Sequence, residues 1–331
     1  MLEWYLLTLT DYAIAAAGIG LAMFLTYQFL PRLGVKREAA TGYALIMPWL
    51  LGFLIWTAYP ILASFYYSLT DYNVFQAPKW VGLDNYVRIL TRDPNFWPSL
   101  KLTLLYGVLS LPIGLAGALG VAMLLARDVR GTGFWRTLYY LPAVLPGVAV
   151  ILLWQWLLGT NGLFNVVFSP IYSLLGMERP SWFTDQRFVL PGLVIMSLWA
   201  VFGSNAVILL AGLKNIPVHL YEAVDIDGGN AWTKFRHVTL PMVSPTLFYT
   251  LILGIIAAVK TFEPGLFIKL NPRTSGTFLQ VLIYANAFAG GNSKMGYASA
   301  MSWIMLVIIL ALTLLTFRTS AAWVYYEGER R

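Results

Sequence analysis

The chain has 331 residues, of which 59% are hydrophobic and only 11% are charged. Ordinary soluble domains carry about 25% charged residues, so this composition excludes a soluble globular fold. The net charge of +7 does not by itself indicate a nucleic-acid partner, because basic residues also gather on the cytoplasmic side of membrane proteins. The absence of cysteine excludes disulfides and thiolate metal sites.

Apolar residues collect into seven runs that contain no Asp, Glu, Lys or Arg. Each run is long enough to cross a bilayer as a helix, which takes about 20 residues. Backbone groups in hydrocarbon must satisfy their own hydrogen bonds, so the runs predict an all-α membrane protein with about seven transmembrane helices. The runs are residues 12–31, 39–70, 102–126, 137–177, 188–213, 237–259 and 295–317.

Two of these runs need interpretation. Residues 12–31 follow a segment that contains Glu3 and Asp11 but no basic residue, which favours a first transmembrane helix over a cleaved signal peptide. Residues 137–177 are too many for one simple span, and the turn signal Gly159-Thr160-Asn161-Gly162 interrupts them. We expect this helix to end near residue 159 and residues 160–187 to lie outside the membrane.

The third run contains a stripe of small residues, which would let another helix approach closely. The stripe consists of Gly114, Ala116, Gly117, Ala118 and Gly120.

The basic residues predict that the N-terminus lies outside and the C-terminus in the cytoplasm. With this orientation the inner segments carry 12 of the 22 Lys and Arg residues, although the outer segments are longer in total. The inner segments are residues 32–38, 127–136, 214–237 and the C-terminal tail, and the outer ones include residues 71–101 and 263–294.

The loop between the fifth and sixth runs has the pattern of an amphipathic helix–turn–helix. Pro217 starts a short helix with apolar residues at helical spacing, and Gly228 and Gly229 end it. A second short helix leads to Pro241, which marks the entry into the next span. Acids in the first helix and bases in the second make a surface suited to a partner or a lipid headgroup. The second helix is expected to place on one face Trp232, Phe235 and Val238.

The segment Glu222-Ala223-Val224-(x)3-Gly228-(x)11-Leu240-Pro241 resembles the signature cytoplasmic loop of the permease subunits of binding-protein-dependent ATP-binding-cassette importers. Val224 stands where a second alanine is usual. The preceding Ile216-Pro217 and Tyr221 are typical of the carbohydrate and glycerol-phosphate branch, the maltose-type permeases. Further matches are Tyr59-Pro60, residues 81–86, Phe134-Trp135-Arg136, Leu141-Pro142 and residues 296–300.

The resemblance spans residues 42–317 and departs from the family in two places. Lys269-Leu270-Asn271-Pro272 replaces the usual Thr-x-Gly-Gly-Pro, and the helix at 12–31 is additional. The resemblance implies a six-helix type I importer core at residues 39–331, with residues 1–38 as an extra transmembrane helix and basic linker.

What the family implies is one half of a channel in the bacterial inner membrane. Its partners would be a second homologous permease, two ATPase subunits that carry ATP and Mg, a solute-binding protein outside, and membrane lipid. The loop 214–241 would dock on the ATPase, and no nucleic acid is expected. The coupling residues implied are Tyr221, Glu222, Ala223, Asp227, Gly228, Phe235, Leu240 and Pro241.

Lys260 and Glu263 are candidates for the translocation path. They are spaced one helical turn apart at the end of the sixth run, and an ionisable residue in a span is a functional candidate by default. Alternatively, Lys260 snorkels outward and pairs with Glu263. The resemblance places this stretch, including Thr261, together with Ser204 and Asn205 of the fifth run, where cargo is contacted midway across the membrane. That cargo would be a sugar or a related polyhydroxylated solute, with a non-sugar solute as the alternative.

Some chemistry is missing from the sequence. No Gly-x-x-x-x-Gly-Lys-Ser/Thr phosphate loop is present, so ATP must be hydrolysed by another subunit. The two histidines, His219 and His237, lie in no metal-ligand cluster, and no bound cofactor is expected. A secondary transporter usually shows an internal repeat, and a membrane enzyme would need catalytic groups gathered at one face. Neither pattern is evident, and co-purification of an ATPase discriminates the importer from both.

Overall fold

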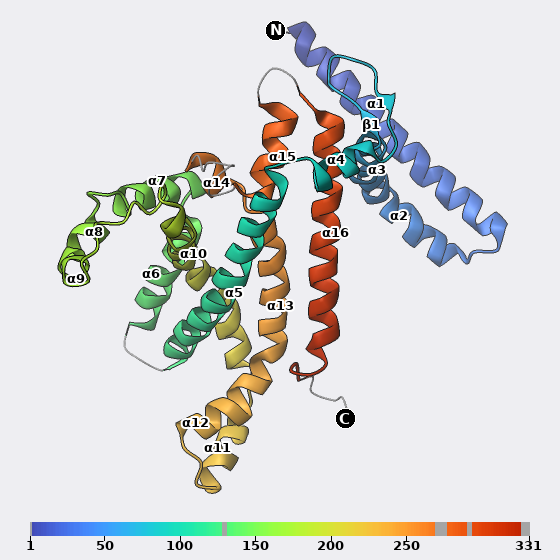
Figure 1. The fold of residues 1–331 in the computed structure, drawn as a ribbon. Helices are drawn as coiled ribbons and strands as arrows, with labels where there is room; N and C mark the ends of the chain where they lie inside the picture. The colour runs from blue at the N-terminus through green and yellow to red at the C-terminus, as the bar shows by residue number, and fades with distance from the viewer. Residues whose placement is uncertain (1, 128–130, 269–276, 290–292, 326–331) are drawn as a thin grey trace. The chain divides into compact units, whose positions relative to one another are not determined.

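The computed structural model describes residues 2–127, 131–268, 277–289 and 293–325. The described chain is mainly helical, with almost no strand, which confirms the predicted fold class. In the residues that the structure describes, six helices are long and apolar enough to cross a membrane, or up to seven if one bent pair forms a single span. The chain forms two compact units, residues 1–69 and 70–331 (Figure 1). The division predicted at residues 38 and 39 stays a prediction.

The first unit contains two candidate spans. Helix α1 (Leu2–Phe29) continues into the 3-10 turn η1 (Leu30–Leu33), which ends at Gly34 with a φ of 87°. Helices α2 (Arg37–Phe53) and α3 (Tyr59–Ser68) are joined through the wide π turn η2 (Leu54–Ala58). Pro60 follows this turn. Because proline has no N–H and its ring crowds the carbonyl four residues earlier, the chain widens there instead of breaking.

Four long helices form the centre of the second unit. In it α5 packs along α10, α13 lies against both, and α16 packs against α13 (Figure 1). A Cβ on Gly114 or Gly117 would overlap Val201 or Phe202, so the small-residue stripe of α5 is a packing surface at these two positions, as predicted; Gly120 has no such neighbour. The bounds are α5 (Phe96–Ala126), α10 (Gln186–Lys214), α13 (Leu240–Val259) and α16 (Met295–Ser320).

The fourth run is broken earlier than the sequence predicts. Helices α6 (Thr132–Val144) and α7 (Gly147–Leu157) meet at an angle of 97°. The expectation of a single helix ending near residue 159 is therefore wrong. The break lies at Leu145-Pro146, where Leu145 is extended (ψ 142°) because a following proline disfavours the helical conformation. The predicted turn is present, with the Gly162 N–H donating to the Gly159 carbonyl at 2.7 Å.

One end of the second unit is closed by a small cap. A two-residue pairing of β1 (Thr70–Asp71) with β2 (Lys79–Trp80) leads into helix α4 (Asp84–Thr91). The buried Asn85 amide donates to the Thr70 carbonyl at 2.9 Å. The Tyr297 hydroxyl at the start of α16 donates to Asp93 at 2.8 Å, and the Arg88 guanidinium lies over the Tyr297 ring. These contacts give a structural reason for two of the motifs, residues 81–86 and 296–300.

The region after α13 contains two short helices, α14 (Glu263–Phe267) and α15 (Leu279–Phe288). We expected only an outer loop here, but α15 packs in the core between α5 and α16, with Leu279 fully buried. Its apolar stretch is too short to register as a membrane-crossing run. The predicted departure at Lys269-Leu270-Asn271-Pro272 lies outside the described residues.

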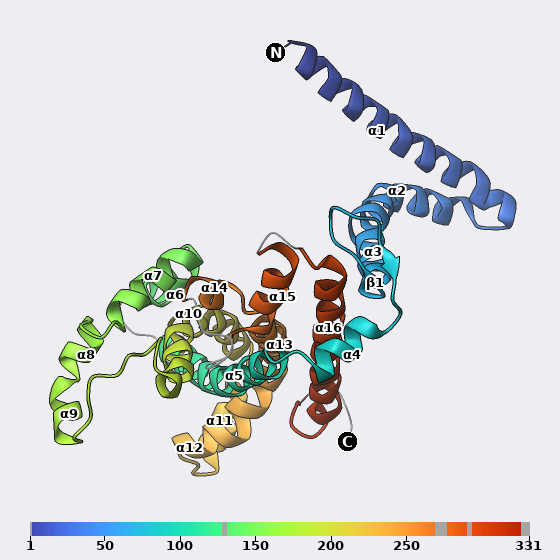
Figure 2. The ribbon, with the colours of Figure 1, turned by 45° about the horizontal axis from the view of Figure 1, so that its top comes forward.

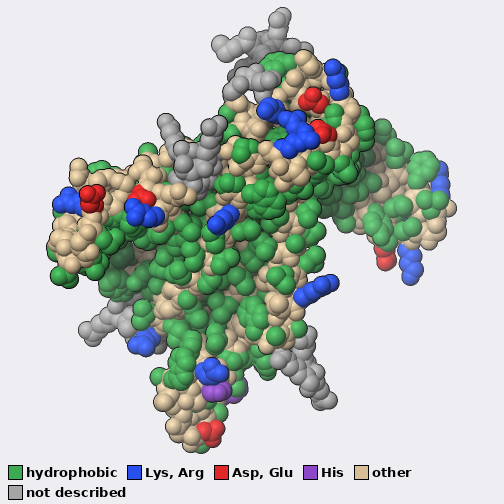
Figure 3. All heavy atoms as spheres, viewed as in Figure 1, with side chains coloured by type: hydrophobic (Ala, Val, Ile, Leu, Met, Phe, Trp, Pro, Cys, Tyr) green, Lys and Arg blue, Asp and Glu red, His purple; other side chains and the backbone are tan. Residues whose placement is uncertain are grey.

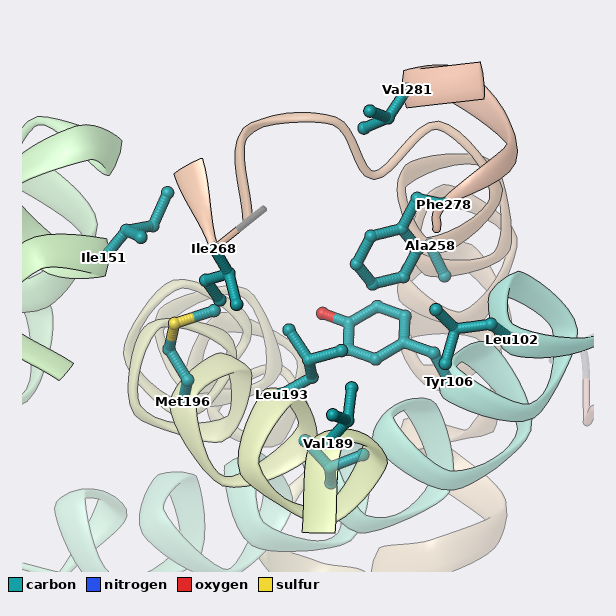
Figure 4. Packing of buried hydrophobic residues seen from close by; sticks show 11 residues of the cluster. Leu102, Tyr106, Ile151, Val189, Leu193, Met196, Ala258, Ile268, Phe278 and Val281 are labelled. Atoms are coloured by element: carbon teal, nitrogen blue, oxygen red, sulfur yellow. The ribbon is translucent and has the colours of Figure 1, made fainter. Parts of the chain in front are cut away.

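One large buried cluster joins α5, α7, α10, α13 and α15. In Figure 4 the Tyr106 ring lies between the side chains of Leu193, Leu102 and Phe278. The Tyr106 and Phe278 rings meet edge to face, with centroids 5.1 Å apart. Burial of such aromatic surface contributes both apolar area and directional ring contacts, so this cluster fixes α5 relative to α10 and to the segment before α15.

The second unit has two distinct ends (Figure 1). One carries α11 (Val218–Ile226), α12 (Ala231–Lys234) and the last described residues. There the Tyr325 N–H donates to the Ser244 hydroxyl at 2.9 Å. The opposite end carries α4 and α15. The loop 214–237 and the final segment thus lie opposite residues 71–95.

Candidate functional site

The coupling loop is the predicted segment, residues 214–241, and its first helix ends in a Schellman turn. Pro217 precedes α11, as the sequence predicts. The Gly229 N–H donates to the Val224 carbonyl at 2.8 Å and the Gly228 N–H to the Asp225 carbonyl at 3.0 Å, the paired bonds that define this turn. Gly228 has a φ of 74°, which a residue with a Cβ adopts only at a cost.

Gly229 is needed for a different reason. A Cβ at this position would overlap the Val224 side chain and come within 3.1 Å of the Thr233 methyl group. The two halves of the loop therefore approach so closely that only hydrogen fits between them. The sequence identified both glycines as a helix breaker but not this close approach.

The second helix of the loop is not separate from the next span, contrary to the sequence expectation. The Asn230 side chain caps α12 by accepting from the Thr233 N–H at 3.0 Å. The chain then passes through the π turn η3 (Phe235–Thr239) directly into α13. Pro241 occupies the second position of α13, the same arrangement that Pro60 has after η2, so proline again widens a helix without ending it.

Two polar contacts connect α11 to the continuous segment formed by α12 and η3. Lys234 and Asp225 form an ion pair at 2.6 Å, and the hydroxyls of Tyr221 and Thr239 are 3.1 Å apart. Phe235 is half-buried against the cluster formed by α5, α10 and α13. Val238 is buried, but Trp232 is exposed and rests on the Phe235 ring, so the predicted apolar face holds only in part.

The predicted coupling residues therefore fall into two groups. Tyr221, Phe235 and Pro241 hold the loop together or join it to α13. The others are exposed, and next to them Ile226 has 86% of its surface exposed. The result is a surface of mixed acidic and apolar character at the tip of the loop. At the tip the exposed residues are Glu222, Ala223, Asp227 and Gly228, and Leu240 is exposed at the start of α13.

A second candidate site is a cavity of about 270 Å³ between α5, α10 and α13. The structure brings together there three of the predicted path residues, Ser204, Asn205 and Thr261. The hydroxyls of Ser204 and Thr261 donate to carbonyls of their own segments. Among the described residues, the Asn205 amide has no hydrogen-bond partner. An amide at a cavity wall with free donors and acceptors can bind a polar solute.

Three further polar residues line this cavity, and sequence reasoning missed them. They add hydroxyl groups from α5 and α13, so each of the three helices contributes polar atoms. Hydroxyl residues one helical turn apart in a charge-free span, as at positions 106 and 110, are a sequence signal that could have predicted a polar lining. The missed residues are Tyr106, Ser110 and Thr250.

Lys260 and Glu263 do not line this cavity. Helix α13 ends at Val259, and α14 begins at Glu263, so the assumed continuous helical turn between the two charges is absent. Both side chains are exposed, and they form no ion pair with each other among the described contacts. The Glu263 carboxylate instead lies against Gly147, at the start of α7. Their role in transport stays a prediction.

Metal chemistry has no visible support in the described part of the chain. No group of three or more His, Asp or Glu side chains there could hold an ion. His237 lies with its Nδ1 atom 3.2 Å from the Thr233 carbonyl, within its own helix.

Several helices that can cross a membrane, a small cavity without a charged side chain and an exposed helical loop at one end fit a membrane transport component. Comparison with known proteins makes this specific. Residues 110–324 match the family of binding-protein-dependent transport system inner membrane components, and the chain belongs to this family. It is therefore a multi-span inner-membrane permease subunit, as the loop motif predicts, and a separate subunit hydrolyses ATP.

Individual proteins are similar over most of the chain. The probable ABC transporter permease protein YesP of Bacillus subtilis (strain 168) is 39% identical over 300 residues, 89% of this chain and 95% of that protein. The probable starch degradation products transport system permease protein AmyD of Thermoanaerobacterium thermosulfurigenes is 29% identical over 81% of this chain and 90% of that protein.

A bacterial alginate ABC transporter, solved in complex with an alginate pentasaccharide-bound periplasmic protein, contains a chain with the same fold. The TM-score is 0.70 at 23% sequence identity, and the match covers 84% of this chain and 93% of that chain. At this identity the likeness concerns the fold alone.

Proposed function

We propose that this permease carries a sugar or a related polyhydroxylated solute through the cavity between α5, α10 and α13. The supporting observation is the chemistry of the lining, which consists of hydroxyls, one amide and apolar groups without a charged side chain. Hydroxylated solutes are bound by such polar groups on an apolar wall. The name of the relative AmyD points in the same direction.

The chain supplies one half of a pathway and pairs with a second homologous permease. Two ATPase subunits carry ATP and Mg, and a solute-binding protein outside delivers the cargo. The tip of the coupling loop docks on an ATPase. Support comes from its exposed mixture of Glu222, Asp227 and Ile226, because an apolar residue rimmed by charges suits a protein partner better than water.

The end that carries the coupling loop then faces the cytoplasm, and the end with α4 and α15 faces outward. Since the chain has no cysteine, single cysteines at Asn73 and Asn230 can be labelled with a membrane-impermeant reagent. We expect labelling from opposite sides. Labelling of both from the same side contradicts this orientation.

The cargo proposal is tested on the assembled transporter in proteoliposomes, with sugar uptake measured across concentrations. Asn205→Ala should raise the half-saturation concentration about fivefold, because one hydrogen bond contributes about 1 kcal/mol. Ser204→Ala has a matched control in Ser302→Ala. Both hydroxyls donate to the carbonyl four residues earlier, but Ser302 does not line the cavity.

Unchanged uptake kinetics in Asn205→Ala and Ser204→Ala, with intact assembly, contradict a cargo role for the cavity. Lys260→Ala and Glu263→Ala are measured in the same assay. Neither residue lines this cavity, so a change in uptake kinetics would show that they act on the translocation path elsewhere. Calorimetry on the cognate solute-binding protein separates a sugar from a non-sugar cargo.

A further inference from the structure

The segment 158–185 between α7 and α10 forms an arm that exposes a stripe of apolar side chains. It contains two short helices, α8 (Leu163–Val167) and α9 (Ser169–Leu174). In both ribbon views these helices extend away from α5, α10 and α13 (Figures 1 and 2). Inside the arm the Asn165 side chain is buried beside the rings of Phe164 and Trp182, whereas one outer face of the arm is apolar.

Asn165 is the centre of the arm and is completely buried. Its amide donates to the carbonyls of Gly159 at 3.0 Å and Pro180 at 2.9 Å. Its carbonyl oxygen accepts from Trp182 Nε1 at 2.9 Å and from the Tyr172 hydroxyl at 3.3 Å. One side chain thus connects both ends of the arm, and the polar groups are satisfied without water.

The opposite face of the arm carries an apolar stripe. Its members recur at helical spacing across α8 and α9. All of them are exposed, and Leu174 has 86% of its surface uncovered. Apolar surface is unfavourable in water, so a continuous stripe of exposed apolar side chains suits an apolar medium. The stripe consists of Leu163, Val166, Val167, Ile171 and Leu174.

The surroundings of the stripe indicate which apolar medium covers it. No charged residue occurs in residues 137–177, and α7, which leads into the arm, also exposes the apolar side chains of Leu152 and Trp156. Charged residues begin only at Glu178 and Arg179, and in Figure 3 the charged side chains follow the upper edge of the arm. An apolar face with charged residues along its edge is typical of a helix that lies at a membrane surface.

We propose that this arm lies at the outer surface of the inner membrane, where its apolar stripe is buried among the lipid acyl chains. A soluble binding protein would leave the stripe in water after each cycle, which makes it a poor permanent cover for so much apolar surface. The outer side follows from the proposed orientation of the coupling loop, but the burial in lipid does not depend on it. The arm would anchor the outer ends of α7 and α10 at a fixed depth.

The test uses spin labels on single cysteines at Val167, Leu174 and Glu178 in the assembled transporter in lipid nanodiscs. Collisions with oxygen report contact with acyl chains, and collisions with a water-soluble nickel chelate report contact with water. The ratio of oxygen to nickel accessibility should be severalfold higher at Val167 and Leu174 than at the charged-edge position Glu178.

Three results overturn the proposal. Equal nickel accessibility at all positions places the arm in water. Low accessibility to both reagents at Val167 and Leu174 identifies a protein neighbour, such as the second permease. Accessibility that falls only when the solute-binding protein is added identifies a docking surface. None of these outcomes bears on the cargo cavity, so the two proposals fail separately.

Discussion

The coupling loop and the arm are similar excursions from the helix bundle with opposite chemistry. Each contains two short helices, α11 and α12 in the coupling loop and α8 and α9 in the arm. The coupling loop is held by peripheral contacts, including Lys234 with Asp225, and exposes charge at its tip. The arm is held by one buried amide, Asn165, and exposes apolar residues. Two short helices alone therefore do not indicate whether a segment faces water, protein or lipid. The exposed side chains indicate this.

The coupling loop and the arm should also differ in how they respond to substitutions. In the coupling loop the backbone geometry matters most, because Gly228 and Gly229 allow a turn that other residues would strain. In the arm a single polar side chain satisfies several backbone and side-chain groups at once. Substitutions at these positions should accordingly differ in the size and the kind of their effects.

The largest effect is expected from Asn165→Leu. Leucine leaves the carbonyls of Gly159 and Pro180 and the Trp182 indole N–H without their partner. Each buried polar group left unpaired costs about 1–3 kcal/mol, so the arm should lose its order. Amide hydrogen exchange of residues 158–185 should rise strongly. Asn161→Leu, at an exposed position of the same segment, is the control and should leave exchange unchanged.

A smaller effect is expected from Gly229→Ala. Its methyl group would overlap the Val224 side chain, and overpacking of this kind costs about 1–3 kcal/mol. Transport and transport-stimulated ATPase activity should fall together while the chain still inserts. Adding Val224→Ala removes the overlapping methyl groups and should restore part of the activity. No recovery in the double variant would show that the close approach is not what the loop needs.

The coupling loop could be predicted from the sequence because its determinants are neighbours in the chain. Pro217, Gly228 and Pro241 act within one or two helical turns, where the rules for helix ends apply. The cavity was only partly predictable, since it requires knowing that Tyr106 and Thr250 face Asn205. Residues so distant in sequence are brought together by helix packing, which a single sequence does not specify.

Other differences have the same origin. The break before Pro146 was hidden inside an unbroken apolar run, which periodicity alone cannot divide. Lys260 and Glu263 were assumed to share a helix that in fact ends between them. The inward role of Asn165 left no mark in the sequence, because an asparagine in a loop usually indicates a turn.

A still smaller effect is expected at Gly228, where two substitutions, Gly228→Asn and Gly228→Val, should differ from each other. The φ of 74° at this position costs an ordinary residue about 1–2 kcal/mol, but asparagine tolerates this conformation. A β-branched residue such as valine fits it worst. ATPase coupling should therefore be nearly normal in the Asn variant and clearly reduced in the Val variant. Equal loss in both would indicate that the partner needs a bare glycine surface rather than the turn.

The smallest effect on folding, but a clear effect on function, is expected from Glu222→Lys. Glu222 is exposed and has no ion pair or side-chain hydrogen bond in the described residues, so reversing its charge should leave the melting temperature of the assembled transporter unchanged. Surface charges far from specific contacts usually change stability by less than about 0.5 kcal/mol. At a docking surface the same reversal should weaken ATPase binding, because like-charge or unpaired contacts oppose association.

The matched control for Glu222→Lys is Glu178→Lys, an exposed acid on the arm. Both variants make the same change in net charge, so a difference between them reports position alone. Uptake and stimulated ATPase activity should fall in Glu222→Lys and stay normal in Glu178→Lys. Co-purification of the ATPase shows whether the loss reflects binding. If both variants transport normally, the exposed acid of α11 does not contact the ATPase. If both lose uptake with the ATPase still bound, the arm is not a passive lipid anchor and the contrast between the two excursions fails.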